Sequence, residues 1–164
     1  MESADVPPID RPLAKTYIVG YKRPDRINGG YLPLFHWSIV VYFHGYPQTK
    51  PYSFEVHEVR GSRGFYIYER EGHSDENSST SMVDQICIGR CPMENVKDMR
   101  EVLREVDVVN ISPEQEWSSR NWCLDALDAL KTAGFGDRFV TRDYFKDWMA
   151  QGELEHAKEL ARPH

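Results

Sequence analysis

A serine and a cysteine near the start of one predicted helix are the side chains best suited to chemistry in this sequence. Ser119 and Cys123 are four residues apart, so both would project from the same face of that helix. A helix start carries partial positive charge and unpaired amide groups, which favour a nucleophile and a developing oxyanion. Ser119, or Cys123 in its place, is therefore a candidate nucleophile.

Such a nucleophile needs a base, and two histidines in predicted strands could supply it. His36 and His57 lie on separate strands, and in antiparallel neighbours of suitable register they would share a face and meet over the helix start. His36 would then be the general base and His57 its orienting partner. A cleft lined with phenols and imidazole suits a small, partly apolar ligand. The candidate substrate-binding side chains are Trp37, Tyr42, Asn121 and Trp122.

Each of these residues also has an ordinary structural role. Serine is a preferred N-cap residue, which alone would explain Ser119. Cysteine is among the most buried residue types, so Cys123 could belong to the core. A serine hydroxyl cannot ionise as a thiol does, so it needs a well-aligned base to become a nucleophile.

The chain resembles the circularly permuted papain-like group in three segments. These are the run FHWSIVV at 35–41, the run FEVH at 54–57 and the Trp-bearing helix that follows. The group includes LRAT-like acyltransferases and phospholipases, PPPDE peptidases and relatives of the NlpC/P60 hydrolases. In its LRAT-like branch a His in a "His-Trp-Ala" strand comes first, a second His ends the next strand, and a nucleophilic Cys opens a helix.

This resemblance implies a permuted papain-like fold and an activity on acyl or amide groups. Aligning the helix on Trp122 places Ser119 at the position of the family's Cys. Residues 119–134 are also similar to uncharacterised fungal proteins that have a "Cys-Gln-x-Trp" helix ending in "Ala-Gly".

The elements that would position these residues follow from hydrophobic spacing. Alternation predicts strands at 16–21, 34–44, 53–59, 64–69 and 85–89, and a further short strand at 106–111. Helical spacing predicts helices that begin after Pro92, at Ser119 and near Thr141. The order predicts an α+β fold: a small antiparallel sheet packed against the central helix at 119–133, with two further C-terminal helices.

The length of 164 residues suits one domain. Residues 14–164 are expected to form it, after a flexible arm at 1–13 and with a mobile polar loop at 71–84.

The composition excludes several functional classes. A net charge of −6 argues against nucleic-acid binding. The longest apolar run, 39–43, is too short to cross a bilayer, and no leader is seen, so no stable membrane insertion and a cytoplasmic location are expected. Three cysteines without a leader indicate reduced thiols, and their spacing does not suit a zinc site. Because the glycines also form no phosphate loop, no metal and no cofactor are expected.

These observations favour a hydrolase or acyltransferase that acts on an acyl or amide group of a small-molecule substrate. Two alternatives remain open. The chain could be a catalytically altered member that serves as a binding or interaction module. It could also be a cofactor-free isomerase or cyclase that uses only acid–base groups: His36, a tyrosine and a carboxylate. The oligomeric state is left open.

Overall fold

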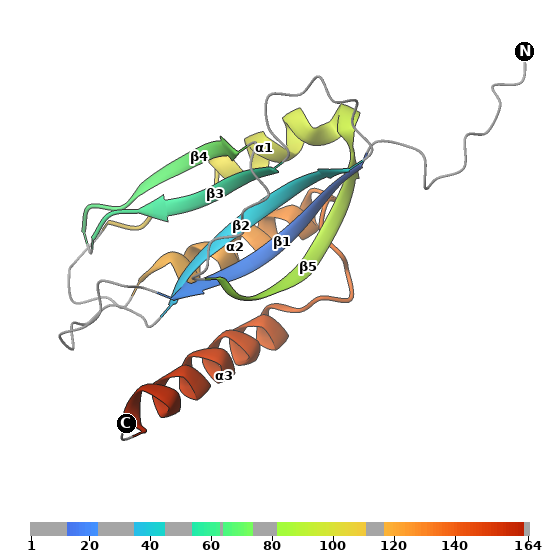
Figure 1. The fold of residues 1–164 in the computed structure, drawn as a ribbon. Coiled ribbons are helices and arrows are strands. Elements are labelled where there is room, and N and C mark those ends of the chain that lie inside the picture. The colour runs from blue at the N-terminus through green and yellow to red at the C-terminus, as the bar shows by residue number, and fades with distance from the viewer. Residues whose placement is uncertain are drawn as a thin grey trace, which may run out of the picture.

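The computed structural model describes residues 13–22, 35–44, 54–62, 64–73, 82–110 and 117–162. In these ranges an antiparallel sheet of five strands packs against three α-helices, which confirms the predicted α+β class (Figure 1). The strands are β1 (Leu13–Lys22), β2 (Phe35–His44), β3 (Phe54–Arg60), β4 (Ile67–His73) and β5 (Met82–Pro92). The helices are α1 (Val96–Arg104), α2 (Ser119–Thr132) and α3 (Arg142–Ala161).

The strands are arranged in the order β4-β3-β2-β1-β5. β1 and β2 pair along their whole length, from Leu13 opposite His44 to Lys22 opposite Phe35. β2 and β3 pair over only four positions, and the last pair joins Ile39 to His57. Beyond that pair the β3–β4 hairpin diverges from β2, so the sheet opens along this line (Figure 1).

The two faces of the sheet have different surroundings. One face, called the helix-covered face, contacts all three helices. Thr16 donates to Met99 of α1, Tyr68 packs on Trp122 of α2, and Trp37 packs on Trp148 of α3. The other face, called the histidine face, carries the residues that alternate with these on β1 and β2. They are Leu13, Lys15, Tyr17, Val19, Tyr21, His36, Ser38, Val40, Tyr42 and His44.

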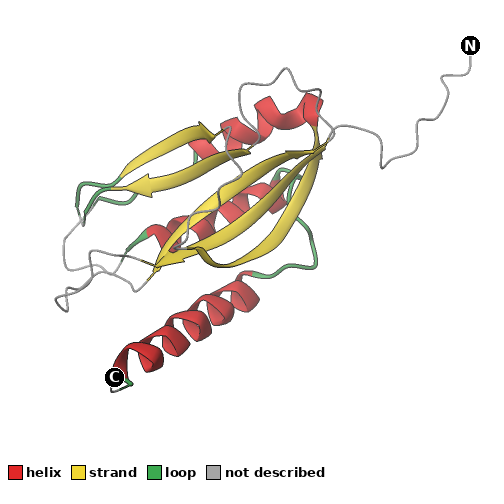
Figure 2. Cartoon of the chain, in the orientation of Figure 1, coloured by secondary structure: helices red, strands yellow, loops and turns green. Residues whose placement is uncertain are grey.

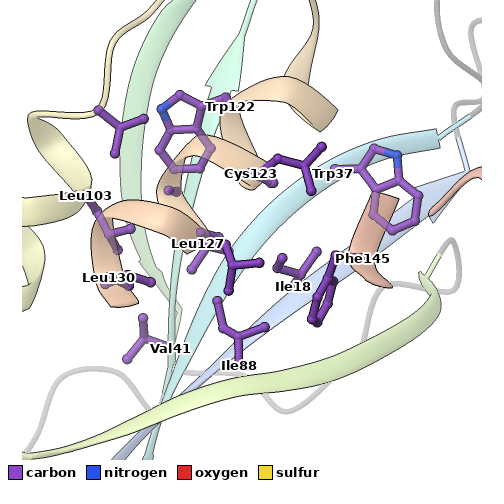
Figure 3. Packing of buried hydrophobic residues seen from close by; sticks show 14 of the residues in the cluster. Ile18, Trp37, Val41, Ile88, Leu103, Trp122, Cys123, Leu127, Leu130 and Phe145 are labelled. Atoms are coloured by element: carbon purple, nitrogen blue, oxygen red, sulfur yellow. The ribbon is translucent and has the colours of Figure 1, made fainter. Parts of the chain in front are cut away.

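The hydrophobic core lies between the helix-covered face and the helices (Figures 2 and 3). The apolar stripe of α2 enters it at helical spacing, since Trp122, Leu127 and Leu130 are fully buried. The stripe packs on strand residues such as Ile18 and Val41, as Figure 3 shows. Burial of each large side chain stabilises the fold by roughly 1.5–3 kcal/mol.

Gly20 allows one of these side chains to lie close to β1. A Cβ atom at Gly20 would be 2.7 Å from the Trp37 ring, well inside contact distance. The indole therefore packs directly on the β1 backbone.

The structure confirms the two helices that were expected to begin at Ser119 and near Thr141. α2 covers Ser119–Thr132, where the helix was expected at 119–133, and Gly134 follows it with the positive φ of a C-terminal cap. Thr141 caps α3 by accepting a hydrogen bond from the backbone N–H of Tyr144 at 3.2 Å.

The expected short strand at 106–111 is wrong for the residues that the structure describes, because 106–110 form no strand. Val106 packs into the core after α1. The Asn110 side chain accepts from the backbone N–H of Tyr66 at 2.6 Å and donates to its carbonyl at 2.8 Å. A side-chain amide, rather than a strand ladder, holds this segment.

The boundaries of the expected loop and arm also change. β4 extends to His73, which pairs with Phe54, and β5 begins at Met82. Leu13 belongs to β1. The remaining positions of the expected loop (74–81) and arm (1–12) lie outside the described residues. Within the described part, none of the helices is both long enough and apolar enough to span a membrane.

Candidate functional site

A histidine–glutamate pair on the histidine face is the best candidate for chemistry. His36 lies on β2 with 21% of its side chain exposed, and Glu58 lies on β3 with 9% exposed. The Nε2 atom of His36 is 2.7 Å from Oε2 of Glu58. Two further side chains donate to the same carboxylate: Ser38 Oγ to Oε2 at 2.8 Å, and Arg60 Nε to Oε1. This set bridges β2 and β3 where the two strands separate.

The electrostatics of Glu58 determine the state of the histidine. Burial works to raise the pKa of Glu58, but the hydrogen bond and charge of His36, with Ser38 and Arg60, outweigh it and lower the pKa from 4.5 to about 2. Glu58 is therefore an anion at neutral pH and can only accept hydrogen bonds. It consequently requires a proton on Nε2 of His36, and the lone pair of the neutral ring lies on Nδ1.

Tyrosines share the face of this pair. Tyr21 lies opposite His36 in the β1–β2 register. Burial, the nearby Tyr42 and the charge of Glu58 raise the pKa of Tyr21 to about 12, so its phenol stays protonated and can donate. Further along the face, the Tyr42 ring packs on Tyr17 at 5.3 Å and on Phe54 at 5.6 Å.

The start of α2 contacts β2 next to the histidine. The backbone N–H of Trp37, the residue after His36, donates to Ser119 Oγ at 3.1 Å. Trp37 has no partner on β3 in the sheet register, because the pairing ends at Ile39. The divergence of the hairpin thus lets a helix residue take the place of a strand partner. Ser119 itself is fully buried.

Asn121, expected to bind substrate, instead belongs to the cap of α2. Its Oδ1 accepts from the backbone N–H of Ser118 at 3.0 Å, and Ser118 is the N-cap residue. This reciprocal arrangement fixes the first turn of α2, from which Ser119 projects.

The expectation that His57 shares a face with His36 is wrong. His57 pairs with Ile39, an odd number of residues from His36 along β2, so it lies on the helix-covered face. It is fully buried, with Nε2 at 2.9 Å from Glu55 Oε1 and Nδ1 at 2.7 Å from the Tyr68 hydroxyl. The carboxylate that contacts His36 is instead that of Glu58, at 2.7 Å.

His57 is part of a buried polar network beneath α1. Arg100 of α1 donates to both carboxylate oxygens of Glu55, at 2.9 and 2.7 Å. Burial would raise the pKa of Glu55, but the bonds from His57 and Arg100 lower it from 4.5 to about 2. Burial also lowers the pKa of His57, so the ring is neutral and its two nitrogens bond to Glu55 and Tyr68. This network anchors α1 to β3.

Cys123 is not placed to act as a thiolate. It is fully buried, and burial together with the charge of Glu58 raises its pKa well above 9.0. The thiol stays protonated inside the core, so the structure does not support Cys123 as the nucleophile.

The two tryptophans expected to bind substrate are core residues. Trp37 points to the helix-covered face, opposite to His36, and Trp122 of α2 packs in the core on that side of the sheet (Figure 3). Tyr42 is the expected substrate-binding residue that does share the face of His36.

Glu58, Ser38 and Tyr21 are not among the site residues predicted from the sequence. One signal was present, because Glu58 lies inside an otherwise apolar strand run, where an acidic residue needs a partner. The identity of that partner depends on the register between β2 and β3, which the alternation within each strand does not reveal.

Nothing in the described ranges gathers three or more His, Cys, Asp or Glu side chains in a geometry that could hold a metal ion. A hollow of about 400 Å³ lies at the C-terminal end of α2, lined by Cys87, Arg90, Phe135 and Asp137 among others. It contains no residue of the His36–Glu58 pair.

Comparison with known proteins identifies a family for this chain. A protein-family model described as a family of unknown function (DUF6914) matches residues 14–152. No curated protein and no solved structure matches the chain.

Proposed function

The chain belongs to the DUF6914 family of unknown function, and from its own side chains we propose that it is an enzyme acting on an acyl or amide group, as a hydrolase or acyltransferase. His36 is the general base, Glu58 orients it, and Ser119 at the start of α2 is the nucleophile. The single observation that carries this proposal is the 2.7 Å contact between His36 Nε2 and Glu58 Oε2. The next residue along β2, Trp37, donates its backbone N–H to Ser119 Oγ.

The order of these parts supports a papain-like arrangement. In the permuted papain-like group that the sequence resembles, a strand histidine lies between an orienting side chain and a nucleophile at a helix start. Here Glu58 takes the orienting position on the neighbouring strand, and its negative charge stabilises the imidazolium that forms when His36 accepts a proton.

The proposed reaction proceeds through an acyl-serine. In the proposed covalent route the start of α2 moves so that Ser119 Oγ, which is buried on the Trp37 amide in this structure, reaches both the substrate carbonyl carbon and Nδ1 of His36. Oγ then attacks the carbon while its proton passes to Nδ1, and the carbonyl electrons form an oxyanion near the amide groups at the start of α2. The oxyanion collapses, and the leaving group departs with the proton from His36. Water, or an acceptor alcohol or amine, then attacks the acyl-serine with His36 again as base. The products are an acid or a transferred acyl group, and Ser119 regains its proton.

A second candidate function uses the same pair without a covalent step. It is favoured by the complete burial of Ser119, whose hydroxyl already accepts from Trp37, and by the protonated phenol of Tyr21 on the face of His36. In this version His36 removes a proton and Tyr21 donates one, as in an isomerisation or cyclisation.

The negative net charge and the three free cysteines support a cytoplasmic setting and a small-molecule substrate rather than a nucleic acid.

Turnover of activated substrates tests the proposal. The panel is p-nitrophenyl acetate, p-nitrophenyl octanoate and p-nitroacetanilide. We expect His36→Gln to lower kcat/KM by about 100-fold or more, because a general base contributes on this order. His44→Gln is the matched control, since His44 lies on the same strand and face but is exposed, and it should leave turnover unchanged.

Ser119→Ala separates the two candidates. Loss of turnover in this variant, with its melting temperature near that of the wild type, supports the covalent route. Retained turnover in Ser119→Ala together with loss in His36→Gln supports acid–base chemistry alone. Equal turnover in the His36→Gln and His44→Gln variants contradicts the role of His36 as the general base of a hydrolase or acyltransferase.

A further inference from the structure

We propose that Glu153 of α3 is a positioning residue for His36. This inference rests on the proposed function, and it assigns to α3 the task of fixing the strand segment that carries the base against the helix start that carries the nucleophile.

One carboxylate contacts both elements. Oε1 of Glu153 accepts from the indole Nε1 of Trp37 at 3.2 Å and from the backbone N–H of Phe35 at 3.4 Å. Its Oε2 lies 3.6 Å from the Arg120 guanidinium on α2. Only 14% of the Glu153 side chain is exposed, so solvent screens these contacts less than it would on an open surface.

The partners of Glu153 are the sequence neighbours of the proposed active groups. Phe35 and Trp37 flank His36, and Arg120 follows Ser119. In a strand, successive side chains point to opposite faces. The hydrogen bonds of Glu153 to Phe35 and Trp37, made from the helix-covered face, therefore fix the position of the β2 backbone between them. His36 projects from this backbone to the other face. The Trp37 amide on Ser119 completes the link between the two elements.

The packing of α3 holds Glu153 in this position. A Cβ atom at Gly152 would be 3.4 Å from the Phe35 ring, an ordinary van der Waals contact, so α3 packs against β2 there. On either side, Trp148 packs on Trp37 at 5.3 Å between ring centroids, and His156 packs on Phe35 at 5.3 Å. The Glu153 carboxylate therefore projects from a packed helix and not from a loop, which fixes its position more precisely.

The family match does not assign this role, because it ends at Gly152, one residue before Glu153.

Three α3 variants test it: Glu153→Ala, Glu153→Gln and the control Glu155→Ala. Glu155 lies on the same helix, is exposed, and accepts a bond from Gln151. For each variant, kcat and KM are measured with p-nitrophenyl acetate. The ring nitrogens of His36 and the indole nitrogen of Trp37 are followed by ¹⁵N NMR.

We expect Glu153→Ala to lower kcat about 10- to 100-fold with little change in KM, because misplacement of a catalytic group acts on the chemical step. The His36 ring signals should move in the same variant. Glu153→Gln should restore much of the loss, since its amide oxygen can still accept from the Trp37 indole. Glu155→Ala should behave as the wild type.

Two failures are distinguishable. If the Trp37 indole signal moves in Glu153→Ala while kcat and the His36 signals stay unchanged, Glu153 has no positioning role and the proposed function stands. If the wild type turns over none of the panel substrates but the His36 signals move, the positioning contact stands and the proposed function falls. The milder Glu153→Gln variant keeps the test valid if Glu153→Ala does not fold.

Discussion

At the scale of single residues, burial distinguishes the two strand histidines. His36 and His57 each contact a glutamate at under 3 Å, yet their surroundings differ. His57 is fully enclosed and bonded at both nitrogens, whereas one fifth of the His36 side chain is exposed. In the sequence both histidines lie in predicted strands, and no local pattern indicates that His57 is buried whereas His36 is partly exposed.

The three cysteines should differ in reactivity in the order of their exposure. Cys87 is half-buried, whereas burial raises the pKa of Cys91 to about 11 and that of Cys123 well above 9.0. We therefore expect iodoacetamide at pH 8 to label Cys87 in the folded protein, and Cys91 and Cys123 only after unfolding in urea. Peptide mass spectrometry measures the labelled fractions. Rapid labelling of Cys123 in the folded state would contradict its complete burial in the core.

At the scale of elements, two features were predictable and one was not. The alternation of apolar residues in β2 and the helical stripe of α2 gave the correct faces, because each depends on residues close in sequence. The register between β2 and β3 depends on a longer connection and on packing, so the opposite faces of His36 and His57 could not be deduced.

The junction between β5 and the end of α2 depends on one glycine. A Cβ atom at Gly89 would be 2.2 Å from the carbonyl oxygen of Phe135, and the nearby Asp137 N–H donates to the Ile88 carbonyl at 2.7 Å. We expect Gly89→Ala to lower the free energy of unfolding by about 2–3 kcal/mol, as overpacking against backbone does.

Gly152→Ala is the control for this prediction. A Cβ there meets only an ordinary contact at 3.4 Å, and alanine favours a helix, so stability should be unchanged or rise by up to about 1 kcal/mol. Urea denaturation measures both variants. Equal free energies of unfolding for Gly89→Ala and the wild type would contradict the close contact between Gly89 and the Phe135 carbonyl.

At the scale of the whole molecule, contacts distant in sequence join the elements into one unit. Arg100 on Glu55 links α1 to β3, and Glu153 on Trp37 links α3 to β2. Neither pair could be inferred from the sequence, because no local periodicity connects residues 45 or 116 positions apart. The fold class was predictable, but the polar partners that define the candidate site were not.

Stability should fall in acid because two glutamates are held ionised in the fold. The pKa values of Glu55 and Glu58 are about 2 in the folded protein, below the ordinary 4.5. Each therefore adds stability that is present above about pH 4.5 and is lost as the pH falls towards 2, on the order of 3 kcal/mol per group. The lowered pKa of His57 acts in the same direction below about pH 6.5.

Urea denaturation at a series of pH values measures this loss. The Glu55→Gln variant, which lacks one of the two carboxylates, should show a shallower decline between pH 4.5 and 2 than the wild type. An identical decline of the free energy of unfolding with pH in the two proteins would contradict the lowered pKa of Glu55.

The most direct test of the account compares Glu58→Gln with Glu55→Gln. Both changes are isosteric and remove a buried charge from β3, but on opposite faces of the sheet. With p-nitrophenyl acetate, we expect Glu58→Gln to lower kcat/KM by about 100-fold or more, because His36 loses the charge that orients it. Glu55→Gln should lower stability while kcat/KM at 25 °C stays within about twofold of the wild type. Equal kcat/KM values for the two variants would contradict the claim that the His36–Glu58 pair carries the chemistry.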